Sequence, residues 1–113
     1  MHDIDRGLLL VFPKRPFVDW LNFVDPAERP MTLNELWREP EAILVKEFES
    51  VGEGDALVKR LCGEIFEHLL SEWHANPNDW PINRDYELFS QWFDVQAVST
   101  VFDQVGRPIQ CFD

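Results

Sequence analysis

Three potential metal ligands, Glu64, His68 and Glu72, are spaced four residues apart. On an α-helix this spacing places all three side chains on one face. Carboxylate and imidazole groups bind divalent cations such as zinc, but the Glu-x-x-His pairs of di-iron helices do not occur in the chain. The same pattern is typical of an ordinary solvated helix face, which is the interpretation that we favour. The sequence therefore predicts no metal site and no cofactor.

Acid–base or nucleophilic catalysis has little support in the sequence. His74 lies near Glu72 and Asp79 along the chain, but a general base needs a partner in fixed geometry, which this spacing does not define. Serines such as Ser71 and Ser90 accompany the histidines, as they do in most chains of this size. The scattered glycines form no phosphate-binding loop, and neither a GxSxG nor an HExxH motif is present. We therefore predict no catalytic residues and a non-enzymatic protein.

A small basic cluster is a candidate binding site. Lys14 and Arg15 fall between a predicted strand and a predicted helix, where open α/β sheets bind ligands and helix amides attract anions. Asn83 and Arg84 belong to a Trp-rich loop that could join them in a pocket for a small anion or an acidic peptide. The alternative, which we favour, is that Arg84 is a structural donor to loop carbonyls and to acids such as Asp79.

Trp80 belongs to the same loop, and its role has two interpretations. Trp73 and Trp92 fall at helical spacing among apolar residues, so we expect both in the core. Trp80 either closes a small core with them or is an exposed anchor for a partner, because Trp and Arg are frequent interface hot spots. Trp80, with Asn83 and Arg84, is therefore added to the candidate partner-binding residues.

The chain is strongly acidic, with a formal net charge of −11 at pH 7 over 113 residues. This charge repels phosphates, so we expect no direct binding to nucleic acid or to membranes, whereas a basic protein partner is favoured. The apolar run at residues 8–12 is too short for a membrane span or a signal peptide. The length indicates a single domain over residues 1–113. Cys62 and Cys111 lack metal-site or disulfide-framework spacing, and we expect a cytoplasmic protein.

Apolar periodicity in the first half predicts two strands and two helices. Residues 7–12 form a continuous apolar run, which predicts a central strand covered on both faces. A helix is predicted to begin near Pro16, which suits a first helical turn. Thr32 and Glu35 form a capping-box pattern that predicts a second, short helix. Residues 42–48 predict a strand that is less buried and nearer an edge.

The second half predicts two further helices and one or two strands. Residues 49–55 are interpreted as a connector, and residues 57–73 as a long amphipathic helix because apolar residues recur every four positions. Asp85 is predicted to cap the next helix. Residues 95–102 predict a third strand. Residues 108–112 predict a fourth strand at an edge, where Pro is tolerated.

Together these elements predict an α+β domain. It has a small mixed β-sheet of three to four strands and about four helices, in the order β-α-α-β-α-α-β-(β). Strand–helix–strand connections favour parallel pairing, but two helices in each connection also allow antiparallel pairing.

Two blocks of the chain resemble a group of small acidic bacterial proteins that are uncharacterised. The first block is residues 11–22, and the second runs from residue 71 through the Trp-Pro-x-Asn-Arg piece to Trp-Phe-Asp at residues 92–94. The resemblance covers about half of the chain and leaves out residues 104–113. It implies a bacterial, cytosolic, single-domain protein and carries no catalytic residues with it.

These observations predict a non-enzymatic protein-binding or regulatory module. Its most definite form is an immunity- or antitoxin-like inhibitor that covers the basic groove of a nuclease. The acids assigned to its binding face are Glu41, Glu47, Glu49, Glu53 and Asp55. One alternative is an anion-binding protein or enzyme that uses Lys14, Arg15 and Arg84. A further alternative, suggested by the net charge, is a DNA mimic.

Overall fold

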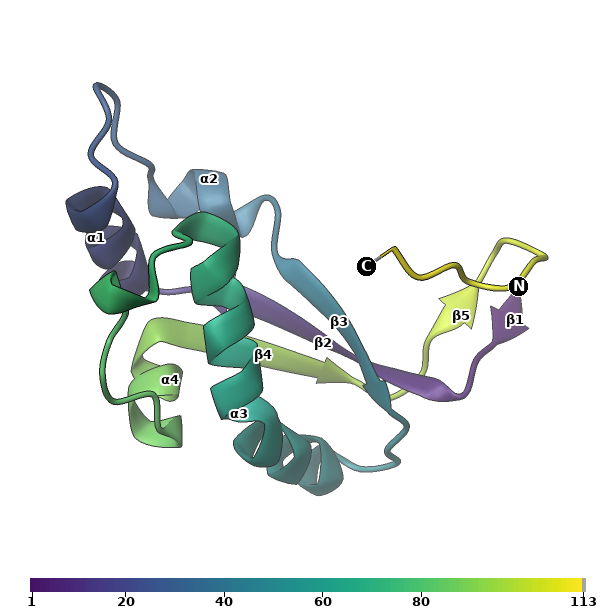
Figure 1. Ribbon diagram of the computed structural model, residues 1–113. Helices are drawn as coiled ribbons and strands as arrows, with labels where there is room; N and C mark the ends of the chain where they lie inside the picture. Colours follow the sequence, from purple (N-terminus) through teal and green to yellow (C-terminus); the bar gives the residue numbers. More distant parts are fainter. Residues whose placement is uncertain (113) are drawn as a thin grey trace.

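A three-stranded sheet with strand order β3-β2-β4 forms the centre of the protein. Its strands are β2 (Arg6–Pro13), β3 (Glu41–Lys46) and β4 (Phe93–Val98), as Figure 1 shows for the computed structural model, which describes residues 1–112. β2 pairs antiparallel with both neighbours in continuous register. The predicted α+β class is confirmed. Every pairing in the described chain is antiparallel, so the sheet is not mixed.

A short two-stranded arm takes the place of the predicted fourth strand. β1 (His2–Asp3) pairs antiparallel with β5 (Phe102–Asp103) beyond the end of the main sheet (Figure 1). The strand predicted over residues 108–112 was wrong, because no strand follows β5 in the described chain. Pro108 has no backbone N–H to donate, and the Ile109 side chain is exposed, so neither a ladder nor a core contact holds this segment to a sheet.

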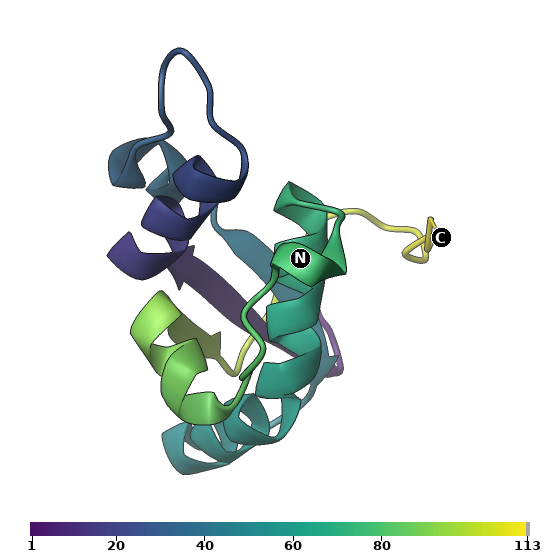
Figure 2. The same ribbon diagram turned by 60° about the vertical axis from the view of Figure 1, so that its left-hand side comes forward.

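Four α-helices connect the strands within the described residues. They are α1 (Arg15–Val24), α2 (Leu33–Trp37), α3 (Val51–Trp73) and α4 (Tyr86–Trp92). A 3-10 turn, η1 (Pro77–Asp79), lies between α3 and α4. Figure 2 shows α1, α4 and α3 together on one face of the sheet. The predicted order β-α-α-β-α-α-β is confirmed for the main sheet.

Side-chain caps explain where two of these helices begin. The Thr32 hydroxyl accepts a hydrogen bond from the Glu35 backbone N–H (3.2 Å) and donates one to the Glu35 carboxylate (3.1 Å), so the predicted cap of α2 is confirmed. Ser50 caps α3 in the same way by accepting from the Glu53 N–H (3.1 Å). The connector predicted over residues 49–55 was therefore wrong. A Ser-x-x-Glu capping pattern inside it starts the helix at residue 51.

The core lies between the sheet and the helix layer. Phe66 of α3 is fully buried and packs against Phe89, Trp92 and Phe93, with ring centroids 5.5–5.8 Å apart. Burial of one such side chain contributes about 1.5–3 kcal/mol. α4 ends at Trp92 so that Phe93 can enter β4 and meet this cluster. The third strand, predicted over residues 95–102, therefore begins and ends earlier than its pattern indicated.

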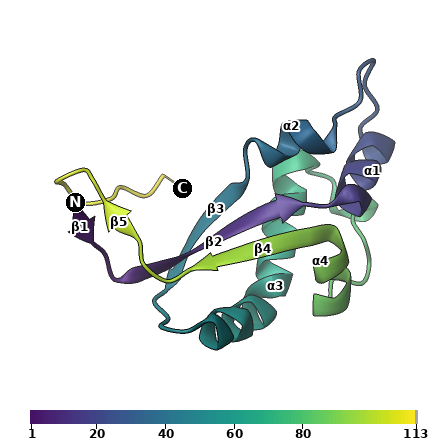
Figure 3. The same cartoon turned by 180° about the vertical axis from the view of Figure 1, so that it is seen from behind.

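Only one face of the sheet is covered by helices. Along β2, Leu9 and Val11 are buried, whereas Leu8 and Leu10 on the other face are only partly buried. Figure 3 looks onto this second face, where no helix lies across the three strands. The prediction that residues 7–12 are covered on both faces was therefore wrong. An unbroken apolar run does not distinguish a covered face from an uncovered face that has kept its apolar residues.

Candidate functional site

Lys14, the first predicted anion-binding residue, uses its charge to hold α4 and β4. Its ammonium donates to the Ser90 carbonyl (3.0 Å) and lies 3.9 Å from the Asp94 carboxylate. Its backbone N–H donates to the Trp92 carbonyl (2.7 Å). Arg15 follows it on the surface, and no hydrogen bond or ion pair of the Arg15 side chain is described. Lys14 therefore acts as a structural donor at the junction between β2 and α1.

Arg84 has a separate set of partners. Its guanidinium donates to the Pro81 carbonyl (2.8 Å) and to the Glu67 carboxylate on α3 (3.0 Å). It also lies over the Trp80 ring, 6.0 Å from the ring centroid. These contacts agree with the predicted role of Arg84 as a structural donor to loop carbonyls and acids. Its acidic partner is Glu67, whereas Asp79 was the example predicted. No described contact joins Arg84 to Lys14.

Trp80 closes the loop that follows α3. Its indole N–H donates to the His74 carbonyl (2.8 Å), and its partly buried ring packs against the core. His74 in turn contacts the Asp79 carboxylate (2.7 Å), and the Trp20 indole donates to the Asp79 carbonyl (3.0 Å). Of the two interpretations of Trp80, the structure therefore supports the packing role.

The tryptophans at positions 73, 80 and 92 do not form one cluster. Trp92 is partly buried and packs against the core through Phe17, Trp20 and Phe66, so it borders the core in which it was expected. Trp73 is 40% exposed, so its expected core position was wrong. It is the last residue of α3, and no further helical turn packs over its ring.

Asn83 supports the start of α4. Its amide donates to the Asp85 carboxylate (3.1 Å), whose other oxygen accepts from the Leu88 backbone N–H (2.9 Å). The Leu88 bond, followed by the Asn83 bond, holds the pKa of Asp85 below its ordinary value of 3.8. The predicted cap at Asp85 is confirmed, and Asn83 belongs to that cap.

A group of possible metal ligands differs from the one that the sequence suggested. Ligand atoms of Glu41, His68 and Glu72 lie within 4.8 Å of one another, so Glu41 from β3 takes the place expected for Glu64. The His68 ring is 3.6 Å from the Glu72 carboxylate. The groups on α3 are exposed, and an exposed His–Glu pair one turn apart is a common feature of helix surfaces. We assign no metal to it.

Part of the predicted acidic face gathers around one hollow. Glu47, Glu49 and Glu53 line a cavity of about 520 Å³ together with Asp3 of β1. The Glu53 carboxylate accepts from the Glu49 backbone N–H (2.9 Å). Glu41, at the other end of β3, and Asp55 are not among its lining residues, so the hollow gathers only three of the five predicted acids.

A groove that the sequence analysis missed runs between β3 and α3. It has a volume of about 410 Å³, and its apolar lining includes Ile43, Leu57 and Leu61. A neighbouring hollow of about 340 Å³ shares Lys46, Leu57 and Arg60 with it, so the two adjoin at these residues and are together called here the β3–α3 groove. The signal in the sequence was a strand predicted near an edge, followed by a long helix with a broad apolar stripe.

Comparison with protein-family models, with curated proteins and with solved structures returned no match for this chain. None of the described helices combines the length and the apolar character that a membrane span requires. The candidate sites therefore rest on the geometry of this structure.

Proposed function

We propose that this protein is a non-enzymatic protein-binding module, and that its uncovered sheet face takes part in binding. The observation that carries the proposal is the apolar character of that face. Leu8 lies directly opposite Leu44 on one neighbouring strand and Val98 on the other, so their side chains share the uncovered face. Leu44 is 44% exposed. Exposed apolar side chains that adjoin one another mark interaction sites more often than scattered ones do.

The edge of the same face adds an aromatic residue, Trp37. The Trp37 ring packs on Phe12 (4.9 Å between centroids), its indole N–H donates to the Pro13 carbonyl, and 43% of its surface stays exposed. Held in this way, Trp37 presents a large surface with little conformational freedom to lose on binding, which is a property of interface anchors. The proposal includes a cytoplasmic setting and, from the resemblance described above, a bacterial source.

Substitution on the uncovered face tests this function. We expect Leu44→Asp to abolish capture of the partner from an extract of the source cell, because a charge placed on an apolar contact surface must be desolvated on binding. Ile82→Asp is the matched control, since Ile82 is also exposed and lies in the loop before α4, away from the sheet. Quantitative mass spectrometry of the captured proteins gives the result, with thermal melting to show that both variants fold. Equal capture by the two variants would remove the proposal.

The acidic hollow favours a second, more specific candidate, an immunity- or antitoxin-like inhibitor with a basic partner. Asp3, Glu47, Glu49 and Glu53 concentrate negative charge around one concavity, and a protein of net charge −11 attracts a basic surface over a distance. We expect the capture to weaken steeply with added salt if the hollow binds the partner. Capture that is insensitive to salt would leave only the apolar face as the binding surface.

The remaining alternatives have less support. An anion pocket needs Lys14 and Arg84 to share a ligand, but each donates to separate partners within the fold. A DNA mimic needs carboxylates spaced like phosphates along an extended surface, whereas the acids that gather here surround a hollow.

A further inference from the structure

The outer edge of β3 is a free strand edge. β3 pairs only with β2 in the described chain, and their register is continuous from Arg6–Lys46 to Val11–Glu41. The strand contains neither a proline nor a bulge, which are two of the features by which proteins prevent an edge from pairing. No turn, cap or side-chain hydrogen bond among the described residues ends on the backbone of β3. Its outward N–H and C=O groups are thus available for an added strand.

Beside this edge lies the β3–α3 groove, which offers space for the side chains of such a strand. Ile43 and Val45 face the helix layer from β3, and Leu57, Leu61 and Ile65 form the apolar wall on α3. Side chains of a strand alternate between the two faces of a sheet. Every second residue of an added strand would therefore enter the groove, and the residues between would extend the uncovered sheet face next to Leu44.

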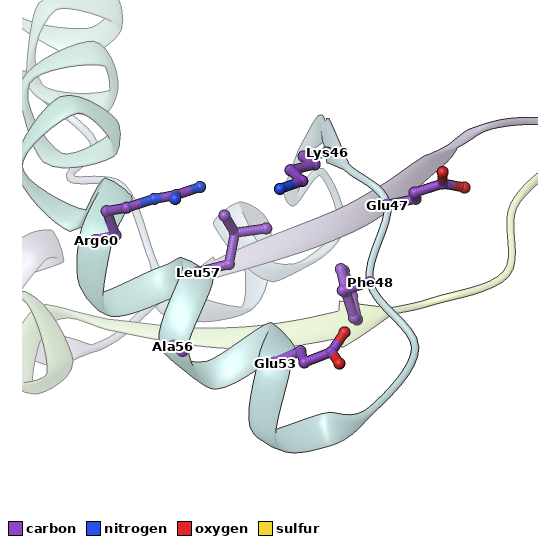
Figure 4. Close-up of a pocket in the computed structure, with 7 residues that line it drawn as sticks. All are labelled: Lys46, Glu47, Phe48, Glu53, Ala56, Leu57 and Arg60. Carbon is purple, nitrogen blue, oxygen red and sulfur yellow. The ribbon is translucent and has the colours of Figure 1, made fainter.

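Two cations stand where the two hollows of the groove adjoin. Figure 4 shows the side chains of Lys46 and Arg60 directed toward each other above Leu57. Neither forms an ion pair within residues 1–112, although the chain has twice as many acids as bases. Two facing cations repel each other, and an anionic group between them would relieve that repulsion.

We propose that the β3–α3 groove binds an extended segment of a partner protein, which adds a strand to β3 and places a carboxylate between Lys46 and Arg60. The inference rests on the proposed protein-binding function and names the chemistry of the bound segment: alternating apolar residues with an Asp, a Glu or a chain-terminal carboxylate at one end. Backbone hydrogen bonds would supply the affinity, and the pocket and the cations would supply the specificity.

A second copy of this chain fits the edge less well. Each copy carries a net charge of −11, so two copies repel each other. An antiparallel pairing of two β3 strands would place Glu41 of one copy near Lys46 of the other, so it is the net charge, not the local charges of β3, that opposes a pair of copies. This repulsion favours a foreign segment that carries its own acid.

The test selects linear peptides from a random phage-displayed library on the full chain and measures binding of the selected peptides by fluorescence polarisation. We expect them to alternate apolar residues with an acid near one end. Charge reversal by Lys46→Glu with Arg60→Glu should weaken their binding by roughly tenfold or more. The matched control, Arg38→Glu with Arg107→Glu, changes the net charge equally at two exposed arginines whose side chains form no hydrogen bond or ion pair within residues 1–112, and should leave binding unchanged.

Two readouts separate this inference from the general function. On peptide binding, hydrogen exchange should slow at alternate amides of β3, because they gain strand partners. The inference is overturned if no peptide is selected, or if selected peptides bind both double variants equally. It is also overturned if sedimentation shows a dimer of this chain in which hydrogen exchange finds the outward amides of β3 already protected. In each of these cases the protein-binding function still stands as long as Val98→Asp, on the uncovered face and outside the groove, abolishes partner capture.

Discussion

Trp80, Arg84 and Lys14 show how single residues that look free in a sequence are used inside the fold. Each donates a hydrogen bond to a backbone carbonyl in a loop or at a helix end: His74, Pro81 and Ser90 in turn. Carbonyls at such positions have no partner within their own element, so a side chain must satisfy them when water is excluded. Sequence reasoning could identify good donors, but their acceptors are set by how the elements pack.

At Asp85 a capping role leads to a prediction about pH. Folding lowers the pKa of this carboxyl group below 3.8. The ionised group therefore stabilises the fold at pH values above 3.8, and that contribution is lost as the pH falls through the lower value of the folded state. In the Asp85→Asn variant this group cannot titrate. We expect the free energy of unfolding of the wild type, measured in urea relative to this variant, to fall as the pH passes below 3.8. A difference that stays constant with pH would contradict this role.

At the scale of elements, α3 begins at a cap that was not recognised in the sequence because the neighbouring residues are typical of a loop. Gly52, Gly54 and Asp55 are all frequent in connectors, and they led to the prediction of a loop. The Ser50 hydroxyl nevertheless satisfies the Glu53 N–H, and the Glu53 carboxylate satisfies the N–H of Glu49. The Glu53 N–H, which the helix start would leave unpaired, and the N–H of Glu49, just before the cap, are thus both bound.

Removal of this cap should destabilise the protein. We expect Ser50→Ala to lower the free energy of unfolding by about 1 kcal/mol, within the range of about 0.5–2 kcal/mol for lost N-caps. Urea unfolding followed by circular dichroism measures the change. Ser71→Ala is the control on the same helix: its hydroxyl donates to the His68 carbonyl, which already belongs to the helix, so we expect a change within about 0.5 kcal/mol. Equal effects at both sites would show that the cap does not hold α3.

The type and order of the main elements were predictable, because apolar periodicity and caps are local signals. The helix predicted over residues 57–73 and the capping box at Thr32 are both confirmed. Pairing partners are not local. β5 pairs with β1 across nearly the whole chain, and nothing in either two-residue segment indicates it. The β3–α3 groove was missed for the same reason. It depends on how an edge strand and a helix are placed relative to each other, which local sequence patterns do not define.

At the scale of the whole molecule, the sheet has a helix layer on one face and none on the other. All the helices that cross the sheet lie on one face, and β3 is left with a free edge and a free face (Figures 2 and 3). A two-layer domain normally reduces such exposure with polar residues on its outer face. Here Leu8, Leu44 and Val98 remain there. The groove and this face adjoin along β3, so one partner could cover both.

The arm formed by β1 and β5 extends beyond the main sheet and makes the protein less compact than is usual for its length. It also supports a final prediction. The radius of gyration is 15.5 Å, whereas a compact chain of this length has about 13 Å. An isolated two-stranded ladder is marginal in water, and Phe102 of the arm is 57% exposed. We expect native-state hydrogen exchange at His2 and Phe102 to be nearly unprotected, because the arm opens without loss of the core. The amide of Leu9, in the central strand, should exchange only through global unfolding. Equal protection at Phe102 and Leu9 would show that the arm and the sheet unfold as one unit.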